Sequence, residues 1–212
     1  MRITILGATG GTGLRLLRQG LERGHEVTAV VRDAARLPDG LRDRLDVHQG
    51  DVTHPGSLAP AVEGRDAVLS ALGPRGRGPT TICQDGIAAV LEAIAGTGTR
   101  RVLMVSASGL AADAGDGPFT RYVLKPLIVQ RVFRDVYADL AKAEDVLRGS
   151  DTDWTIVRPS RLTDGGPTGR YRTALDLNVR GGHTTTRADL ADCMLALIGD
   201  ASSVRRVVSV AS

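Results

Sequence analysis

The sequence predicts an α/β protein with a Rossmann-type, doubly wound parallel sheet that carries helices on both faces. Two observations indicate this fold class. Apolar runs of strand length alternate with helix-length segments along the 212 residues, which is typical of parallel strands joined by helical crossovers. The glycine-rich stretch Gly7-Ala8-Thr9-Gly10-Gly11-Thr12-Gly13 separates the first apolar run from the first helical pattern, and this is the position of a dinucleotide phosphate loop.

The predicted strands are the buried-type apolar runs at 3–6, 27–31, 45–49, 67–72, 102–105, 154–157 and 207–210. Parallel strands end at the same edge of a sheet, and ligands of such sheets bind outside these carboxyl ends. The residues that follow the strands, namely Arg32, Asp51, Gly73 and Ser106, are therefore expected to converge on the phosphate loop.

The helices are predicted from apolar residues spaced by three and four positions. The first carries Leu14, Leu17 and Leu21 on one face and closes at Gly24, a typical C-terminal glycine. Others are expected at 80–96, at 127–147 with Pro126 in the first turn, and from Thr186 to Leu197. Thr186 with Asp189 three residues later resembles a capping box, although Asp has a shorter reach than the usual Glu.

Composition favours one globular domain over residues 1–212, with a small substrate-side lobe at about 159–186. Net charge is +3 and the basic residues are scattered, so we expect no nucleic-acid partner. We find no uninterrupted apolar run long enough to span a membrane and no signal peptide, so we expect a cytoplasmic protein without a membrane partner.

The cysteines and histidines do not suggest a metal site. Cys83 and Cys193 lie far apart and are expected to be free buried thiols. The four histidines have no metal-ligand spacing. We expect no metal.

The end of the second strand predicts the choice of dinucleotide. A carboxylate at this point would accept hydrogen bonds from a ribose 2′-hydroxyl and favour NAD, whereas Arg32 offers a cationic fork suited to a 2′-phosphate. Arg36 lies one helical turn further on. Asp33 beside Arg32 argues mildly against this interpretation. The pattern predicts that NADP(H) is preferred over NAD(H).

Other strand ends supply the remaining candidate residues. Asp51 either meets the adenine together with Val52 or caps the following segment, and the sequence leaves both open. Ser106 orients the carboxamide of the nicotinamide, donates a hydrogen bond to a substrate, or hydrogen-bonds to local backbone, and the sequence leaves these open. The predicted cofactor residues are Gly7, Thr9, Gly10, Gly11, Thr12, Gly13, Arg32, Arg36, Asp51, Val52, Ala71, Leu72, Gly73, Arg75 and Ser106.

Several motifs give the chain a family resemblance over nearly its whole length. They include the glycine-rich loop, Gly50-Asp51-Val52, Val31-Arg32-Asp33, Ser106-Ala107, Thr155-Ile156-Val157-Arg158-Pro159 and Pro167-Thr168-Gly169. With these motifs the chain resembles the atypical short-chain dehydrogenase/reductases of the NAD(P)H-binding, NmrA-like family. Within that family it looks most like the NADPH-dependent flavin reductase, or biliverdin-IXβ reductase, branch.

The resemblance implies roles for individual residues. Arg32 and Arg36 would hold the 2′-phosphate, Arg75 would lie near cofactor and substrate, and Ser106 would be catalytic at the active site. Ser108, Pro159 and Arg161 are the further substrate-side candidates.

One departure from the wider superfamily restricts the chemistry. Its better-known members place a tyrosine and a lysine four residues apart on one helix face, but Tyr122, Tyr137 and Tyr171 are followed four later by Pro, Ala and Leu. Lys142 is predicted to face solvent. Without this acid/base pair, the sequence favours hydride transfer to a small-molecule flavin, quinone or tetrapyrrole-like acceptor.

Two questions remain open from the sequence. The segment 113–133 contains an apolar stretch that would serve as a substrate lid, a homodimer face or the docking site of a protein partner. A non-catalytic NADP(H)-binding redox sensor or regulator of the NmrA-like type is the alternative to a reductase.

Overall fold

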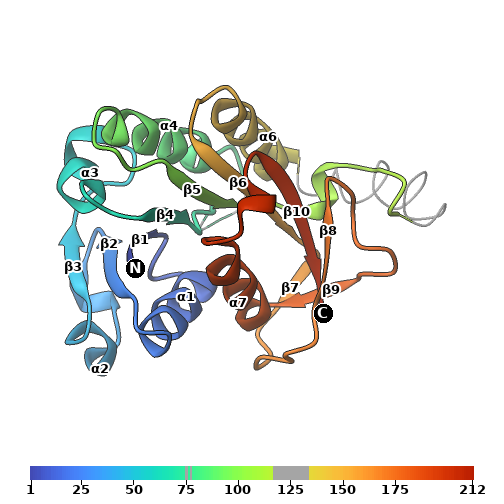
Figure 1. Cartoon of the computed structure of the whole chain (residues 1–212), viewed down its shortest axis with the longest axis horizontal. Helices are drawn as coiled ribbons and strands as arrows, with labels where there is room; N and C mark the ends of the chain where they lie inside the picture. Colours follow the sequence, from blue (N-terminus) through green and yellow to red (C-terminus); the bar gives the residue numbers. More distant parts are fainter. Residues whose placement is uncertain (75, 77, 117–133) are drawn as a thin grey trace.

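The computed structural model describes residues 1–74, 76, 78–116 and 134–212. Its centre is an eight-stranded sheet in the order β3-β2-β1-β4-β5-β6-β10-β8 (Figure 1). All neighbours in this sheet pair in parallel except β8, which runs antiparallel to β10. The strands are β1 (Arg2–Leu6), β2 (Glu26–Val31), β3 (Asp46–Gln49), β4 (Ala67–Ser70), β5 (Arg101–Val105), β6 (Asp153–Pro159), β8 (Arg172–Leu175) and β10 (Arg206–Ala211).

The helices confirm the predicted alternation. They are α1 (Gly11–Glu22), α2 (Asp39–Arg42), α3 (Pro55–Val62), α4 (Ile82–Ile94), α6 (Arg134–Arg148) and α7 (Arg187–Leu197), with short 3-10 turns η1 (Ala34–Arg36), η2 (Ser108–Leu110) and η4 (Ala201–Ser203). The predicted start of the long helix, including Pro126, lies outside the described residues. Lys142 is exposed, as predicted.

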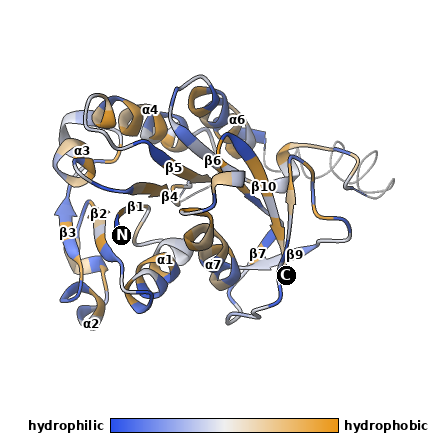
Figure 2. Ribbon diagram, viewed as in Figure 1, coloured by the Kyte–Doolittle hydropathy of each residue, from blue (hydrophilic) through white to orange (hydrophobic). Residues whose placement is uncertain are grey.

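The helices cover the sheet on both faces (Figure 1). α1 packs against α7 on one face, while α3, α4 and α6 pack in a row on the other. Figure 2 shows apolar residues on the inner sides of these helices and along the central strands. This distribution is what a doubly covered parallel sheet requires, because its strands are buried on both faces.

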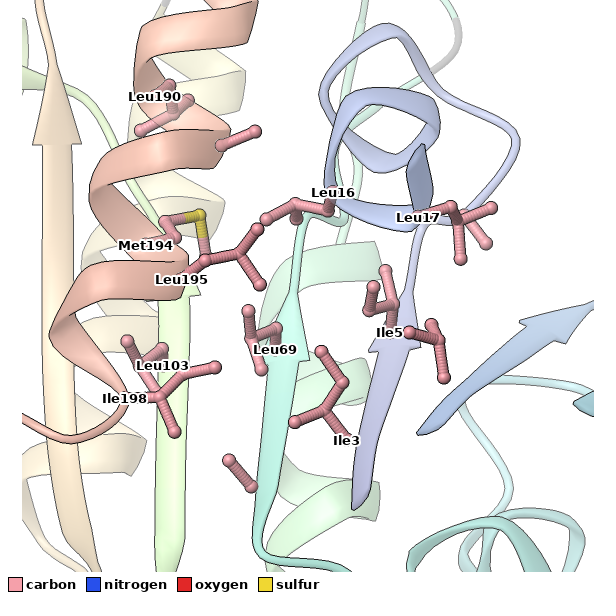
Figure 3. Close-up of a cluster of buried hydrophobic side chains, with 14 of the residues drawn as sticks. Ile3, Ile5, Leu16, Leu17, Leu69, Leu103, Leu190, Met194, Leu195 and Ile198 are labelled. Carbon is pink, nitrogen blue, oxygen red and sulfur yellow. The ribbon is translucent and has the colours of Figure 1, made fainter. Parts of the chain in front are cut away.

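Each face has its own hydrophobic core. Figure 3 shows the α1/α7 side, where Leu16, Leu17 and Met194 meet Ile5 and Leu69 of the sheet. These residues have no more than a trace of exposed surface. The tight packing fixes the start of α1, and with it the glycine-rich loop, against the carboxyl ends of β1 and β4.

Two predicted helix ends are also confirmed. Gly24 has φ +73° directly after α1, which places it in the left-handed region that favours glycine. The Thr186 hydroxyl accepts a hydrogen bond from the Asp189 backbone N–H at 2.9 Å. The Asp189 carboxylate instead accepts from the Thr168 backbone N–H at 2.8 Å and from the Thr168 hydroxyl at 2.7 Å. It therefore anchors the loop before β8 to α7.

The region between β6 and α7 contains strands that the apolar pattern did not indicate. β7 (Arg161–Thr163) pairs in parallel with β9 (Thr184–Thr186) as a separate small sheet, and β8 joins the main sheet. The lobe expected at about 159–186 thus shares a strand with the main sheet, and the division of the chain into domains stays a prediction. In the described parts of the chain, no helix is long and apolar enough to cross a membrane.

Candidate functional site

A cavity of about 1000 Å³ lies at the carboxyl ends of β1, β2, β4 and β5. Proteins bind small molecules and cofactors in cavities up to about this size. Strand order reverses between β1 and β4, so the cavity occupies the switch point at which doubly wound sheets bind dinucleotides.

The glycine-rich loop forms one wall because two of its glycines allow backbones to approach closely. Gly7 has φ +73°, and a Cβ atom there would lie 2.4 Å from the Ala71 carbonyl oxygen. A Cβ at Gly13 would lie 2.1 Å from the Gly7 carbonyl oxygen. Gly13 itself does not line the cavity. It lies beneath the loop, and because it has no side chain, the first turn of α1 can pack directly against Gly7.

The start of α1 offers hydrogen-bond donors to the cavity. Its N-cap is Gly10, which has no capping side chain, and its first turn contains no acidic residue. In the described part of the chain, the backbone N–H groups of Gly11 and Thr12 have no acceptor among the loop and turn hydrogen bonds. Free N–H groups and the positive end of a helix dipole suit a phosphate group. These residues therefore fit the pyrophosphate of a dinucleotide.

Arg32 and Arg36 line the same cavity at the end of β2. Both are exposed, and within the described residues neither forms an ion pair. The carboxylate of Asp33 accepts a hydrogen bond from the Ala35 backbone N–H at 3.0 Å, which caps η1. Asp33 is therefore occupied in stabilising the turn that carries Arg36.

Asp51 and Val52 also line the cavity. The Asp51 carboxylate accepts hydrogen bonds from the backbone N–H and hydroxyl of Thr53, at 3.0 and 2.8 Å, and these bonds hold its pKa below the usual value. The carboxylate thus shapes the turn before α3. The adenine contact stays a prediction, compatible with this turn.

The opposite end of the cavity is mainly apolar. Ala71, Leu72 and Gly73, all predicted as cofactor residues, follow β4 and line this end together with Ile82, Val105 and Leu162. The last three were not predicted, since they look like ordinary core positions in the sequence. The position of the nicotinamide beside Gly73 stays a prediction. Arg75 lies outside the described residues, as does most of the segment 113–133.

The predicted cofactor residues mostly come together around this cavity. Its lining includes Gly7, Thr9, Gly10, Gly11, Thr12, Arg32, Arg36, Asp51, Val52, Ala71, Leu72 and Gly73. Two further lining residues, Arg187 and Leu162, come from the region after β6. Arg187 follows the cap residue Thr186, and its sequence position gives no sign that it reaches the phosphate loop.

Ser106 lies behind the cavity wall rather than on it. It follows the lining residue Val105 but is only 5% exposed. Its hydroxyl donates a hydrogen bond of 2.6 Å to Glu144 on α6, not to local backbone. A hydroxyl whose hydrogen is engaged in this way retains only its acceptor lone pairs for a cofactor or substrate. The catalytic role of Ser106 stays a prediction.

Glu144 is the centre of a buried charge network. It is fully buried and accepts bonds from Arg158, at 2.8 and 2.5 Å, and from Arg148, at 2.7 Å. Burial raises the pKa of this carboxyl, but the hydrogen bonds and charges of Arg158, Ser106 and Arg148 outweigh burial and lower it. The network fixes the end of β5 against α6.

The other substrate-side candidates do not line the cavity. Ser108 begins η2, Pro159 ends β6 as a buried residue, and Arg161 is exposed at the start of β7. Their roles stay predictions. No group of three potential metal ligands occurs among the residues that the structure describes.

Comparison with known proteins tests this interpretation. A family model described as NAD(P)H-binding matches residues 7–201. The chain belongs to this NAD(P)H-binding family. The match spans the phosphate loop, the arginine pair and α7, so it covers the whole cavity. The NAD(P)H-binding family expected from the sequence is thereby confirmed.

Three solved structures share the fold. A Streptococcus pneumoniae protein named as a candidate NADH-flavin reductase is 25% identical, with a TM-score of 0.81 over 100% of this chain and 99% of its own. ChuY, an anaerobilin reductase from Escherichia coli O157:H7, is 22% identical, with a TM-score of 0.82 over 100% and 97%. A Veillonella parvula short-chain dehydrogenase/reductase, solved in complex with NADP, is 21% identical, with a TM-score of 0.81 over 100% and 94%.

Proposed function

We propose that this protein is an NADPH-dependent reductase that transfers a hydride to a flavin, quinone or tetrapyrrole-like acceptor. One observation carries the proposal. A single cavity at the switch point is lined by two exposed arginines at one end, by an uncapped helix N-terminus in the middle and by apolar side chains at the other end. This order of surfaces matches the 2′-phosphate, pyrophosphate and nicotinamide of NADPH.

The arginine pair supports NADPH over NADH. Arg32 and Arg36 line the cavity and form no ion pair within the described chain, although the charge of Arg32 helps to lower the pKa of Asp51. A planar guanidinium suits a phosphate. The Veillonella relative was solved with NADP, whereas the Streptococcus relative is named for NADH. The relatives therefore do not decide the preference, and the proposal depends on these two arginines.

The apolar end of the cavity supports a planar acceptor. Leu72, Ile82, Val105 and Leu162 offer surfaces against which a flat ring system packs. The tyrosine and lysine pair that assists alcohol dehydrogenation is absent from the sequence. Flavins, quinones and tetrapyrroles delocalise the added charge themselves, and the names of two structural relatives refer to flavin and tetrapyrrole reduction.

The protein's part in this reaction is binding and orientation. When bound, NADPH would supply a hydride to the acceptor, and the acceptor would take its proton from solvent. Gly11 and Thr12 would bind the pyrophosphate through their N–H groups. Ser106 would act indirectly, because its bond to Glu144 holds the end of β5 behind the lining residue Val105. The apolar wall would exclude water from the two stacked rings.

The test follows absorbance at 340 nm with NADPH or NADH and a series of acceptors, beginning with FMN and a soluble quinone. We expect acceptor-dependent oxidation that is faster with NADPH at limiting cofactor. Arg32→Ala should weaken NADPH binding about tenfold to a hundredfold, the effect of losing a charge-assisted hydrogen bond, and should leave NADH unchanged. Arg18→Ala, an exposed arginine on α1 outside the cavity, is the matched control.

The alternative is a non-catalytic NADP(H) sensor. It is favoured by Ser106, whose hydroxyl is engaged with Glu144 behind the cavity wall. A sensor would bind NADP+ and NADPH with different affinities but would oxidise no NADPH with any flavin, quinone or tetrapyrrole. That outcome would overturn the reductase proposal while leaving cofactor binding intact.

A further inference from the structure

We infer that Arg187 is a pyrophosphate-binding residue, supplied from outside the phosphate loop by the first turn of α7. The inference rests on the NADP(H) binding proposed above and concerns a residue that the sequence motifs do not mark. Arg187 lines the same cavity as the loop.

The Arg187 side chain lies against the phosphate loop. A Cβ atom at Gly11 would lie 2.7 Å from Cδ and 2.9 Å from Nε of Arg187. The arginine therefore lies directly on the first residue of α1, where the free N–H groups face the cavity. A phosphate bound by those N–H groups would be within reach of the guanidinium.

Contacts between α1 and α7 hold Arg187 beside the phosphate loop. Gln19 of α1 donates a hydrogen bond of 3.0 Å to the Ala188 carbonyl oxygen, next to Arg187. Arg23, the C-cap residue of α1, forms an ion pair with Asp192 of α7. These contacts fix the base of Arg187 beside the loop before any ligand is bound.

Arg187 lies in an unfavourable electrostatic environment. It is the first residue of α7, where a cation meets the positive end of the helix dipole. The acidic residue of that turn, Asp189, uses its carboxylate to accept hydrogen bonds from Thr168 and Ser212. Arg187 also lies against the start of α1, which has no acidic residue in its first turn. A residue that breaks a local rule in this way points to a functional site.

Within the described structure, the positive charge of Arg187 has an ion-pair partner that interacts with it only weakly. Arg187 forms an ion pair of 2.6 Å with Asp164, whose side chain is 87% exposed. An exposed pair of this kind contributes little free energy. A doubly charged pyrophosphate, bound at the same time by helix N–H groups, would compete with Asp164 for the guanidinium. Cofactor binding would then release Asp164, which follows β7, from Arg187.

The experiment measures binding by isothermal titration calorimetry with three probes: NADP+, NAD+ and adenosine 2′-monophosphate, which lacks the pyrophosphate. Arg187→Ala should weaken NADP+ and NAD+ alike, by about tenfold to a hundredfold, and should leave adenosine 2′-monophosphate unchanged. Arg32→Ala should show the reverse pattern, weakening NADP+ and adenosine 2′-monophosphate but not NAD+.

Two further variants complete the set. Asp164→Asn removes the competing carboxylate and should tighten both dinucleotides by about two- to fivefold. Arg18→Ala on the outer part of α1 should bind all three probes as the wild type does. Melting temperatures without ligand show whether each variant is folded.

Three results would overturn the inference. They are unchanged dinucleotide binding in Arg187→Ala, a parallel loss of adenosine 2′-monophosphate that indicates general damage to the site, and a wild type that binds neither dinucleotide. The reductase proposal fails separately, because a protein that binds NADP+ through Arg187 but oxidises no NADPH with any acceptor contradicts only that proposal.

Discussion

Gly13 shows how one residue positions the phosphate loop. A Cβ at this position would lie 2.1 Å from the Gly7 carbonyl oxygen and 2.8 Å from Ala8 Cα. Both neighbours are backbone atoms, so neither can move aside as a flexible side chain would. Gly56 in α3, by contrast, has open space around its would-be Cβ.

We predict that Gly13→Ala displaces α1 from the loop and weakens NADP+ binding by at least tenfold. Gly56→Ala should bind as the wild type does and should be neutral or stabilising by roughly 0.5 to 1 kcal/mol, since alanine is the better helix former. Calorimetric titration and urea unfolding of both variants check this. Equal binding by the two alanine variants would show that the loop tolerates the displacement.

The buried carboxylate of Glu144 predicts a pH dependence. Its pKa is lowered in the folded protein, so the charged form contributes stability above the unfolded pKa of about 4.5. That contribution is lost as pH falls through the lower folded pKa. Ionised Glu144 therefore stabilises the folded protein at neutral pH, and its protonation should destabilise the protein at acid pH.

Glu144→Gln should lose about 3 kcal/mol of unfolding free energy at pH 7, because Arg158, whose side chain is only 12% exposed, then keeps its charge without its partner. The difference from wild type should shrink below pH 4. Urea unfolding at several pH values measures it. Glu92→Gln, an exposed glutamate on α4, is the control, and a Glu144→Gln deficit that stays constant with pH would contradict the assignment.

At the scale of elements, a buried arginine side chain binds the C-terminal end of α7. Arg101 on β5 is 8% exposed and donates to the carbonyl oxygens of Leu197 and Ile198, at 2.5 and 3.1 Å. Its remaining donors bond to Asp153, Thr155 and Ser203. The guanidinium thus satisfies carbonyls at the end of α7 that no intrahelical N–H can reach.

Arg101→Met should therefore destabilise the protein by roughly 3 kcal/mol, since several buried acceptors lose their donors. Arg100→Met is the matched control. Arg100 is exposed, its ion pairs with Asp151 and Asp153 are long at 3.8 and 3.7 Å, and its loss should change stability by less than about 1 kcal/mol. Urea unfolding of the two variants compares them. Similar losses in both would show that the buried network contributes little.

Some helices and strands could be predicted from the sequence, and others could not. The central strands and α1 were predictable, because runs such as 3–6 and 102–105 are apolar throughout and the first helix has a clear apolar face. β8 was not, because its residues Arg172–Leu175 lie at a sheet edge with largely exposed side chains and have no apolar pattern.

The candidate site also contains residues that could be predicted from the sequence and residues that could not. Residues of the phosphate loop and strand ends were predictable because spacing along the chain determines their position. Arg187 and Leu162 reach the cavity only through the packing of α7 and β7, which a single sequence does not reveal. Ser106 was predicted at the nicotinamide, but its bond to Glu144 depends on a partner 38 residues away.

At the scale of the whole molecule, cofactor and fold are expected to stabilise each other. The cavity draws its walls from both halves of the sheet and from α7, and the unfolded chain has no such arrangement. A ligand that binds only the folded state adds stability according to its concentration and affinity.

NADP+ at a hundred times its dissociation constant should raise the free energy of unfolding by about 2.7 kcal/mol, which corresponds to a melting temperature higher by roughly 5 to 10 °C. NAD+ at the same concentration should raise it less, and Arg32→Ala should bring the two dinucleotides to the same shift. A thermal-shift series checks this. An equal shift in the wild type would contradict the assigned preference.

The turn after β2 has a consequence for how this protein can evolve. Arg32 and Arg36 are exposed, belong to neither hydrophobic core and, within the described chain, form no ion pair. Substitutions there are nearly free of a stability penalty. Under the role proposed for these two arginines, natural selection can change the preference of a protein of this fold between NADP(H) and NAD(H) through one surface turn, while its core and phosphate loop stay as they are.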